Sequence, residues 1–358
     1  MPTTATQPLL SSLVLGYTKE RDPKALAALL SRGVVFASRQ AAAAASPLCA
    51  GDAIGPVLLD PATYEKWDAV ELRSQSWPLT LEGLPDWLDR QISSGVDLVL
   101  TPAGFVAWNK PNQLRAAIEY GAQCREVASS WPCALTLVLD NRWLEKSAAE
   151  VADELAAVDA PIALVLSALY DPLKSPHAIS GLRHLIESVP QLVLLRSDLH
   201  GLGAIAHGAA AAAIGTNPTL RHLHPPWGSR RGKAKVRDPS PVVLAKPLGR
   251  YGHGAVLQQV EHDQGLLTCD LEACCDGRPL HRFGAPDEHG TLHLEALLHN
   301  LATTNAIADE VLVGSQGTRI SNWREYCREA YNANQELYRR SRIGPLRPPA
   351  YLEAWAEM

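Results

Sequence analysis

Several features that would define a protein class are missing from this chain of 358 residues. No apolar run approaches 18 residues, so we expect no membrane-spanning helix. The first residues, Met1 to Gln7, place no basic run before an apolar stretch, so we expect no secretory signal peptide. The formal net charge of −5 gives no overall electrostatic attraction to nucleic acid.

The cysteines do not form the even, regular set of a disulfide framework. There are seven, and four stand alone along the chain: Cys49, Cys124, Cys133 and Cys327. A reduced, cytoplasmic compartment therefore fits best. The other three, at positions 269, 274 and 275, crowd into seven positions, which is a spacing suited to a metal.

Hydrophobic residues make up 46% of the chain, enough for a large core. Eight short apolar runs alternate with Ala/Leu/Glu-rich segments of helix length. The runs are Leu13–Tyr17, Gly33–Ser38, Pro56–Asp60, Asp97–Ala103, Ala134–Asn141, Pro161–Leu169, Gln191–Leu199 and Ala210–Asn217. The clearest helical segments are Asn112–Ser129, Lys146–Val158 and Ile179–Val189. Continuously apolar strands are buried on both faces, as in a parallel sheet.

Eight such strands, each followed by a crossover, predict an α/β fold of the (β/α)8 TIM-like barrel type, with a doubly wound open sheet as the alternative. We expect the barrel to occupy residues 1–227. Residues 228–358 would hold a basic loop, a zinc-binding subdomain and a helical C-terminal tail. Within them, Pro241–Ala245 and Ala255–Val260 are expected to be short strands, and 291–340 mostly helix.

The cysteine cluster and a later histidine predict a metal site. Cys269, Cys274, Cys275 and His299 would form a Cys3His group, which is a closed structural Zn²⁺ site that ties the C-terminal helix to the barrel. Two alternatives stay open. One of the adjacent cysteines is a bystander, replaced as a ligand by His281, His289 or His293. Otherwise, the cysteines are free buried thiols beside a histidine on a helix face.

Polar residues that end the apolar strands are candidates for an active site. They are Asp60, Asp140, Ser167, Asp171, Arg196, Asp198 and His200. At the carboxyl ends of barrel strands such residues meet at one mouth, although each could instead cap a helix. We predict Asp140 and Asp198 as general acid/base or nucleophile, with Arg142 and Arg196 holding an anion. Ser167 and His200 would line the same substrate site.

Two further segments have the composition of anion-binding loops. Thr216, in a Gly-Thr turn after the last strand, and Arg221 would contact a phosphate, unless these small residues serve close packing. Five basic residues follow within eight positions: Arg230, Arg231, Lys233, Lys235 and Arg237. A nucleic acid could neutralise them, whereas the alternative is a solvated loop.

A barrel followed by a basic segment, a cysteine cluster and the pair His299-Asn300 resembles the tRNA-guanine transglycosylase superfamily. The zinc subdomain of that family reads C-x-C-x-x-C and continues to a helix with a His-Asn pair. Cys269 is similar to its first cysteine, and Cys274 or Cys275 to its last. The stretch Val99–Phe105 is similar to a family strand reading T-D-S-G-G-F, and Ile214–Arg221 to a segment ending L-P-T-R. The resemblance extends over residues 95–310, but only a few positions in this range carry it.

The chain departs from this pattern at catalytic positions. Leu271 stands where the family has its middle cysteine, and Pro102 and Ala103 stand in place of the aspartate of T-D-S-G-G-F. The late-strand nucleophile is also absent. A transglycosylase needs one carboxylate to attack the sugar and another to move the proton of the base. Asp140 would keep a base-recognising role, and Asp198 would take over as nucleophile.

The resemblance implies a protein that acts on or binds a nucleobase, a nucleotide or a nucleic acid, tRNA or DNA. One alternative is a non-catalytic nucleic-acid-binding or partner subunit, and a second is a phosphate-ligand barrel, a lyase or isomerase, without zinc. A homodimer would use the leucine-rich helix that follows the cysteines, although such a stripe is more often core. Its leucines are Leu292, Leu294, Leu297, Leu298 and Leu301.

Overall fold

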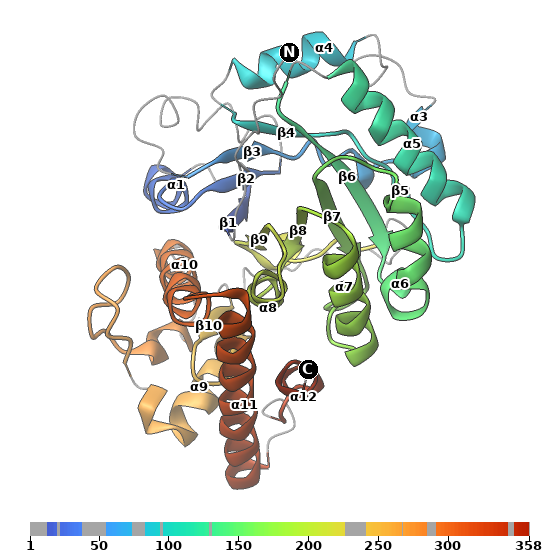
Figure 1. Cartoon of the computed structure of the whole chain (residues 1–358). Coiled ribbons are helices and arrows are strands. Elements are labelled where there is room, and N and C mark those ends of the chain that lie inside the picture. Colours follow the sequence, from blue (N-terminus) through green and yellow to red (C-terminus); the bar gives the residue numbers. More distant parts are fainter. Residues whose placement is uncertain are drawn as a thin grey trace.

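The computed structural model describes residues 13–19, 22–37, 55–73, 83–93, 96–128, 131–225, 241–266, 268–284, 291–342 and 347–357. Within these residues, parallel strands form a closed eight-position barrel surrounded by helices (Figure 1). The strands are β1 (Leu13–Thr18), β2 (Val34–Phe36), β3 (Val57–Leu59), β4 (Leu98–Leu100), β5 (Phe105–Val106), β6 (Cys133–Asp140), β7 (Ile162–Ser167), β8 (Leu192–Ser197) and β9 (Ala211–Gly215). All eight predicted strand regions contain an observed strand.

Two short strands, β4 and β5, together occupy one of the eight strand positions, and this arrangement closes the barrel. β4 pairs with β3 and with the start of β6, whereas β5 pairs with the end of β6. β4 and β5 therefore share one position in the barrel, and the pairing of β4 with β6 closes it. On the other side, β1 pairs with both β2 and β9. The closed sheet confirms the barrel and excludes the doubly wound alternative.

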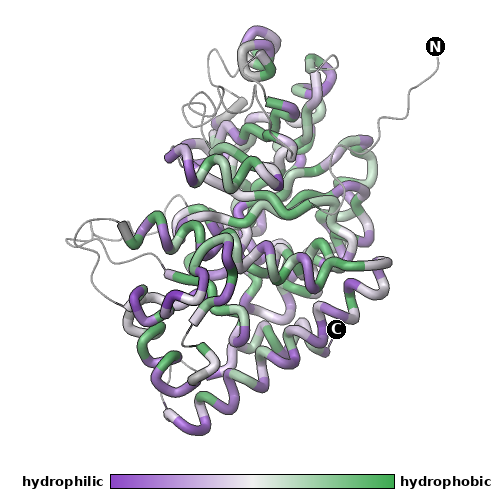
Figure 2. The backbone as a smooth tube through the Cα atoms, turned by 90° about the vertical axis from the view of Figure 1, so that its left-hand side faces the viewer, coloured by the Kyte–Doolittle hydropathy of each residue, from purple (hydrophilic) through white to green (hydrophobic). Residues whose placement is uncertain are grey.

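The strands alternate between two hydrophobic layers, as the twofold period of a strand requires. Along β6, Ala134 and Val138 face the barrel interior, whereas Leu135, Leu137 and Leu139 face the surrounding helices. Both layers are buried, which explains why the strands read as continuous apolar runs. Figure 2 shows this as hydrophobic colour along the central strands and alternating colour along the helices.

Helices of the outer ring follow the strands. They are α1 (Pro23–Leu30), α3 (Ala69–Arg73), α4 (Leu84–Ile92), α5 (Pro111–Val127), α6 (Arg142–Leu155), α7 (Pro176–Ser188) and α8 (His200–Ala206). The predicted helices near 112–129, 146–158 and 179–189 correspond to α5, α6 and α7. The start of α1 illustrates the local signals, because Asp22 caps the helix by accepting from two backbone N–H groups and Pro23 occupies its first turn.

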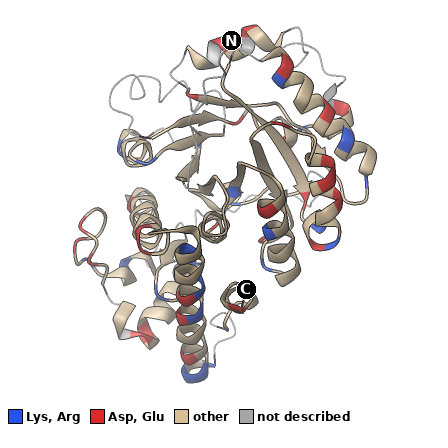
Figure 3. Ribbon diagram, in the orientation of Figure 1, with Lys and Arg blue, Asp and Glu red and all other residues tan. Residues whose placement is uncertain are grey.

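The C-terminal elements form a lobe beside the barrel (Figure 1). They are the hairpin β10 (Val242–Leu244) and β11 (Gly249–Tyr251), α9 (His253–His262), α10 (Thr291–Val311), α11 (Gln316–Ser341) and α12 (Ala350–Glu357). α10 packs against α1, β1 and α8, so it also takes a place in the outer ring between the last barrel strand and the first. α12 packs against α7 and α11. Along α11, basic and acidic residues alternate (Figure 3).

One predicted strand is wrong. Ala255–Val260 lies in α9, and not in a strand. Val256 and Val260 are buried and stand four positions apart, so they lie on one face of a helix that packs into the C-terminal lobe. The apolar content of a short run did not distinguish helix from strand here.

Among the described residues, we find no helix that combines the length and apolar character needed to cross a bilayer.

Candidate metal centre and barrel mouth

Three thiols and one imidazole meet where the cysteine segment faces α10. The ligand atoms of Cys269, Cys274, Cys275 and His299 all lie within 4.8 Å of one another. His299 Nδ1 is 3.3 Å from Cys275 Sγ and 3.8 Å from Cys274 Sγ. Both adjacent cysteines thus face the imidazole. Four such groups converging on one point could hold a metal ion.

A tight backbone turn brings the three thiols together. The carbonyl of Leu271 accepts hydrogen bonds from the backbone N–H groups of Cys274, Cys275 and Asp276, and Gly277 N donates to the carbonyl of Cys269. Asp276 and Gly277 adopt φ of 48° and 75°, a left-handed conformation that reverses the chain. Leu271 stands where the pattern C-x-C-x-x-C would place a cysteine, and its carbonyl holds the turn. The adjacent Cys274 and Cys275 supply the second and third thiols of the group.

The histidine of α10 is held in one orientation by the hairpin. His299 Nε2 lies 2.8 Å from the carbonyl of Val243, and Asn300 Oδ1 accepts from the N–H of the same residue at 2.6 Å. Asn300 Nδ2 also donates to the carbonyl of Pro241. If Nε2 carries the proton, Nδ1 keeps its lone pair toward the thiols, as in metal sites whose histidine is fixed by an outer partner. The His-Asn pair therefore joins α10 to β10.

Arginine side chains surround the thiol group. Arg282 Nη2 donates to Cys275 Sγ at 3.0 Å, and Arg278 donates to the carbonyls of Cys274 and Cys275. Hydrogen bonds with the Cys269 and Cys274 thiols, and also with His299 and Arg282, lower the pKa of the Cys275 thiol, whereas hydrogen bonds with Cys269 and Cys275 raise the pKa of the Cys274 thiol. A thiolate is the form that binds a metal, so the surroundings of Cys275 favour the binding form at that one sulfur.

Two of the three alternative histidines lie away from the thiols. His281 and His293 are exposed and do not belong to the group of converging ligands. His289 and the basic residues Arg230, Arg231, Lys233, Lys235 and Arg237 lie outside the described residues.

At the carboxyl ends of the barrel strands, an aromatic and acidic cluster fills the interior. The hydroxyls of Tyr17 and Tyr64 both donate to Asp60 Oδ2 at 2.6 Å. Asp60 is fully buried, and burial raises the pKa of its carboxyl despite these hydrogen bonds. Leu220 and Leu223, from the segment after β9, complete the same interior core. The inner end of the barrel mouth is therefore packed.

Arg196 enters this cluster through an irregularity in β8. The register between β8 and β9 shifts between Leu194 and Ser197, and Arg196 has a φ of 49°. Its guanidinium donates to Glu65 Oε1 at 2.7 Å and to the carbonyl of Thr219 at 2.8 Å. The guanidinium carbon lies 5.7 Å from the ring centres of both tyrosines. Both terminal nitrogens of the residue predicted to hold an anion thus bind protein groups, whereas its buried Nε has no hydrogen-bond partner within the described residues.

The other candidates at β6 and β7 lie together. Asp140 and Ser167 are neighbours in the register of the two strands, and Leu223 forms a bridge with Ser167. Asp140 is paired with Arg142 through two hydrogen bonds of 2.9 and 2.7 Å. The buried Ser167 Oγ and His222 Nε2 have no hydrogen-bond partner in the part of the chain that the structure describes.

Asp198, the predicted nucleophile, sits between two arginines. Arg250 Nε from β11 donates to its Oδ1 at 2.6 Å, and Arg221 Nη1 lies 3.7 Å from its Oδ2. Burial raises the pKa of this carboxyl, but Arg250 and Arg221 outweigh burial and hold the pKa well below its usual range. Asp198 is thus an ionised partner of two guanidinium groups. Arg250 had no sequence signal, because its partner is distant in the chain.

His200 and Thr216 are also occupied by protein groups. His200 Nε2 lies 2.7 Å from Asp171 Oδ2, and the indole N–H of Trp355 in α12 donates to His200 Nδ1 at 3.0 Å. This pattern requires a neutral imidazole that donates to Asp171. The N–H of Thr216 donates to the carbonyl of Tyr17, so this group does not face a phosphate.

Comparison with protein-family models finds no match to this chain, and comparison with curated proteins finds none either.

Proposed function

We propose that this chain is a tRNA-guanine transglycosylase-like protein that binds a nucleobase, carried by a nucleic acid, at the carboxyl ends of β6 and β7. The observation that carries the proposal is the buried Ser167 Oγ, which lies beside Asp140 in the register of β6 and β7 and has no hydrogen-bond partner among the described residues. His222, the neighbour in sequence of the Leu223 that bridges to Ser167, has a second such atom, Nε2. Buried polar atoms are normally hydrogen-bonded, so such atoms at the carboxyl end of a barrel indicate a ligand.

The chemistry of these three residues suits the edge of a base. Asp140 accepts hydrogen bonds, whereas a serine hydroxyl and a neutral imidazole each donate or accept. Burial and the neighbouring His224 lower the pKa of His222 to about 4, so its imidazole is neutral at pH 7. Arg142, half-exposed above Asp140, would contact the ligand from outside. The basic segment that contains Arg230 would hold the phosphates of the polymer.

The metal group supports the same family. Its thiols lie after the last barrel strand, and its histidine lies on α10, which returns to the outer ring of the barrel. Three thiols and one imidazole are the ligand set of a closed structural Zn²⁺ site, and oxygen-preferring Mg²⁺ or Ca²⁺ would not select it. When bound, zinc would fix the cysteine turn against α10 and β10 and would take no part in chemistry.

A non-catalytic role, as a nucleic-acid-binding or partner subunit, is the second candidate. A specific observation favours it, because both predicted catalytic carboxylates are paired with guanidinium groups. To attack a sugar, Asp198 would have to leave Arg250, whose Nε lies 2.6 Å away. We therefore expect base binding without rapid base exchange by the isolated chain.

The base site is tested by variants that keep the fold. Ser167→Ala and His222→Phe each remove one hydrogen-bonding atom, so we expect each to weaken binding of guanine or a guanine-containing oligonucleotide roughly 10-fold. Fluorescence titration of the purified protein measures the dissociation constant. Ser321→Ala, which removes an exposed hydroxyl of α11, is the matched control and should bind like wild type.

Exchange of labelled guanine into tRNA, measured with the same preparations, separates the two roles. Turnover by the wild-type chain would count against the non-catalytic role. Wild-type protein that binds neither the base nor the oligonucleotide would remove the proposal altogether and favour the barrel with a phosphate ligand.

A further inference from the structure

Two large hydrophobic side chains are exposed at the carboxyl end of β7. Tyr170 is 61% exposed, the most of any large hydrophobic side chain among the described residues, and its neighbour Leu169 is 59% exposed. Single exposed hydrophobic residues are common, but these two follow closely after Ser167, whose buried Oγ has no hydrogen-bond partner within the described residues. The loop after β7 therefore offers an aromatic ring next to the proposed base site.

A second aromatic ring lies on the same rim of the barrel. In the registers of β5, β6 and β7, Val106, Leu139 and Leu166 stand level, so the loops after these strands begin side by side. Neighbouring strands are about 4.8 Å apart, which separates the starts of the loops after β5 and β7 by roughly 10 Å. Trp108 follows β5, is partly exposed, and packs edge to face on the buried Trp143 with ring centres 5.2 Å apart. This contact holds the Trp108 ring in place.

A lysine ammonium lies over each of these rings. Lys174 Nζ is 4.7 Å from the centre of the Tyr170 ring, and Lys146 Nζ is 5.8 Å from the centre of the Trp108 ring. Both distances are within the range of a cation–π contact, and both lysines are exposed. Proteins that bind single-stranded nucleic acid combine aromatic rings, on which bases stack, with cations that follow the backbone. The surface on either side of the end of β6 has this make-up.

The charge of this rim is weakly positive. Residues 107–110, 140–146 and 168–175 carry four basic and three acidic side chains. Two of the acids have partners, since Asp140 is paired with Arg142 and Asp171 Oδ2 lies 2.7 Å from His200 Nε2. We therefore expect stacking on the rings, more than charge, to supply the affinity for a polyanion.

The proposed base site requires its ligand to leave the stack of neighbouring bases. Asp140 and Ser167 are buried, so a base in a nucleic acid reaches them only when it is turned out of the stack. The bases before and after it then lose a stacking partner. In complexes with single strands, aromatic side chains commonly replace that partner. Tyr170 and Trp108 stand on the rim that such neighbours would cross.

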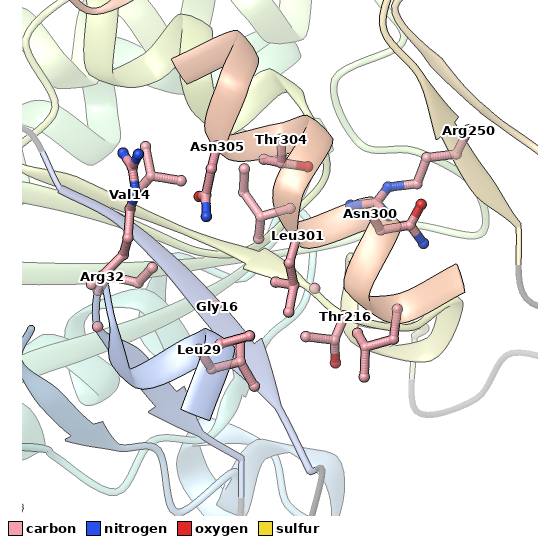
Figure 4. A pocket seen from close by; sticks show the side chains of 16 residues that line it. Val14, Gly16, Leu29, Arg32, Thr216, Arg250, Asn300, Leu301, Thr304 and Asn305 are labelled. Atoms are coloured by element: carbon pink, nitrogen blue, oxygen red, sulfur yellow. The ribbon is translucent and has the colours of Figure 1, made fainter. Parts of the chain in front are cut away.

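A cavity on another side of the barrel, between β1, β9, α1 and α10, does not offer a place for a nucleotide (Figure 4). Leu297 and Leu301 of the predicted leucine stripe on α10 are among the side chains that line it. Its free volume is about 30 Å³, which is room for one or two water molecules. The open rim of β5 to β7 is therefore the better place for flanking nucleotides.

We propose that Tyr170 and Trp108 stack on the nucleotides that flank the bound base in a single-stranded nucleic acid, and that Lys174 and Lys146 contact their phosphates. The position of the bound base in this arrangement rests on the proposed function. The exposed rings and their lysines concern the flanking nucleotides alone, so failure of the rim can be told apart from failure of the base site.

Binding of short RNA oligonucleotides to the full chain tests this surface. One probe is a uridine oligonucleotide with a central guanosine, the second has uridine throughout, and the third is free guanine. Tyr170→Ala should weaken binding of the first probe roughly 10-fold, whereas Tyr170→Phe keeps the ring and should bind it nearly like wild type. Free guanine has no flanking nucleotide, so Tyr170→Ala should lower its affinity little. Fluorescence anisotropy of the labelled oligonucleotides and a fluorescence titration with guanine give the dissociation constants.

The matched control is a similar pair of side chains in the C-terminal lobe. The Tyr338 ring on α11 has its centre 6.0 Å from the guanidinium carbon of Arg347, so Tyr338→Ala removes a comparable contact and should bind all probes like wild type. Trp108→Leu, which keeps an apolar side chain against Trp143, should weaken oligonucleotide binding about as much as Tyr170→Ala. A thermal melt of each variant confirms that the fold is kept.

Salt dependence separates the lysine from the ring. Lys174→Gln removes one phosphate contact, so the slope of the logarithm of the binding constant against the logarithm of the salt concentration should become shallower by about 0.7. Tyr170→Ala removes no charge and should leave this slope unchanged. An unchanged slope in Lys174→Gln would overturn the phosphate contact.

Tyr170→Ala and Trp108→Leu proteins that bind the oligonucleotides like Tyr338→Ala would overturn the proposal, and so would wild-type protein that binds no oligonucleotide at about 1 mM. Neither result touches the base site, which free guanine and Ser167→Ala test by themselves. Wild-type protein that binds both oligonucleotides equally and does not bind guanine would remove the base site. Weaker oligonucleotide binding by Tyr170→Ala would then support the rim as a nucleic-acid surface of its own.

Discussion

We expect the wild-type protein to contain about one zinc ion per chain, as proposed above, and the replacement of His299 by alanine to remove it. Because binding energy of a structural zinc site is also folding energy, the midpoint of thermal unfolding should fall on the order of 10 °C. The loss would begin at the hairpin, since His299 Nε2 is hydrogen-bonded to Val243 of β10. Elemental analysis and a thermal melt of the same preparation measure both effects.

The control for this variant lies on the same helix. His293 is exposed on α10 and is not one of the converging ligands, so His293→Ala should keep the metal and nearly the whole melting temperature. A chelator should lower the melting temperature of wild type and of His293→Ala, but not that of His299→Ala. Well-folded wild-type protein without zinc would contradict the metal assignment and remove its support for the transglycosylase-like family.

The second large effect is expected at Asp198. Asp198→Asn keeps the shape of the side chain but removes the carboxylate that the buried Arg250 and Arg221 both contact. Breaking a buried ion pair by removing one partner costs about 3 to 5 kcal/mol, so the free energy of unfolding should fall by that amount. Urea unfolding measured at pH 7 gives the difference.

Asp140→Asn is the matched control for this variant. The partner of Asp140, Arg142, has a side chain that is 49% exposed, so solvent stabilises it once the carboxylate is lost. We expect a cost below about 1 kcal/mol. Equal losses in the two variants would mean that the arginines at Asp198 are as well solvated as Arg142, and would contradict a buried ion pair at Asp198. Asp198→Asn combined with Arg250→Gln should recover part of the lost stability, because fewer charges then stay unpaired.

The free energy of unfolding should depend on pH in a way that reflects the same ion pairs of Asp198. Arg250 and Arg221 hold the pKa of Asp198 well below its usual range, although burial opposes them. A depressed carboxyl pKa stabilises the fold fully above the unfolded value of about 4, and this contribution is lost as the pH falls through the folded pKa. The difference between wild type and Asp198→Asn should therefore be constant near pH 7 and shrink below about pH 4. A difference that grows on acidification would contradict this ion-pair assignment.

The barrel was predictable because its signals are local. Each strand is a short apolar run buried on both faces, and a run such as 162–167 carries that information within six residues. The group of three thiols and one imidazole that could hold a metal ion was predictable for a similar reason, since the thiols share one turn and the histidine lies on the next long helix. The exception was Ala255–Val260, where a short apolar run fitted either helix or strand and packing in the C-terminal lobe selected the helix.

The roles of the polar residues were decided only by tertiary structure. Asp198 and Arg250 are 52 positions apart, and their ion pair exists because the β10–β11 hairpin docks at the end of β8. Arg196 points into the barrel mouth because β8 changes register there. The sequence alone does not show whether a charged residue at the end of a strand faces a ligand or another side chain. Local hydrophobic patterning therefore determined the barrel, whereas long-range pairing determined which charges are neutralised and which buried donors stay without a partner.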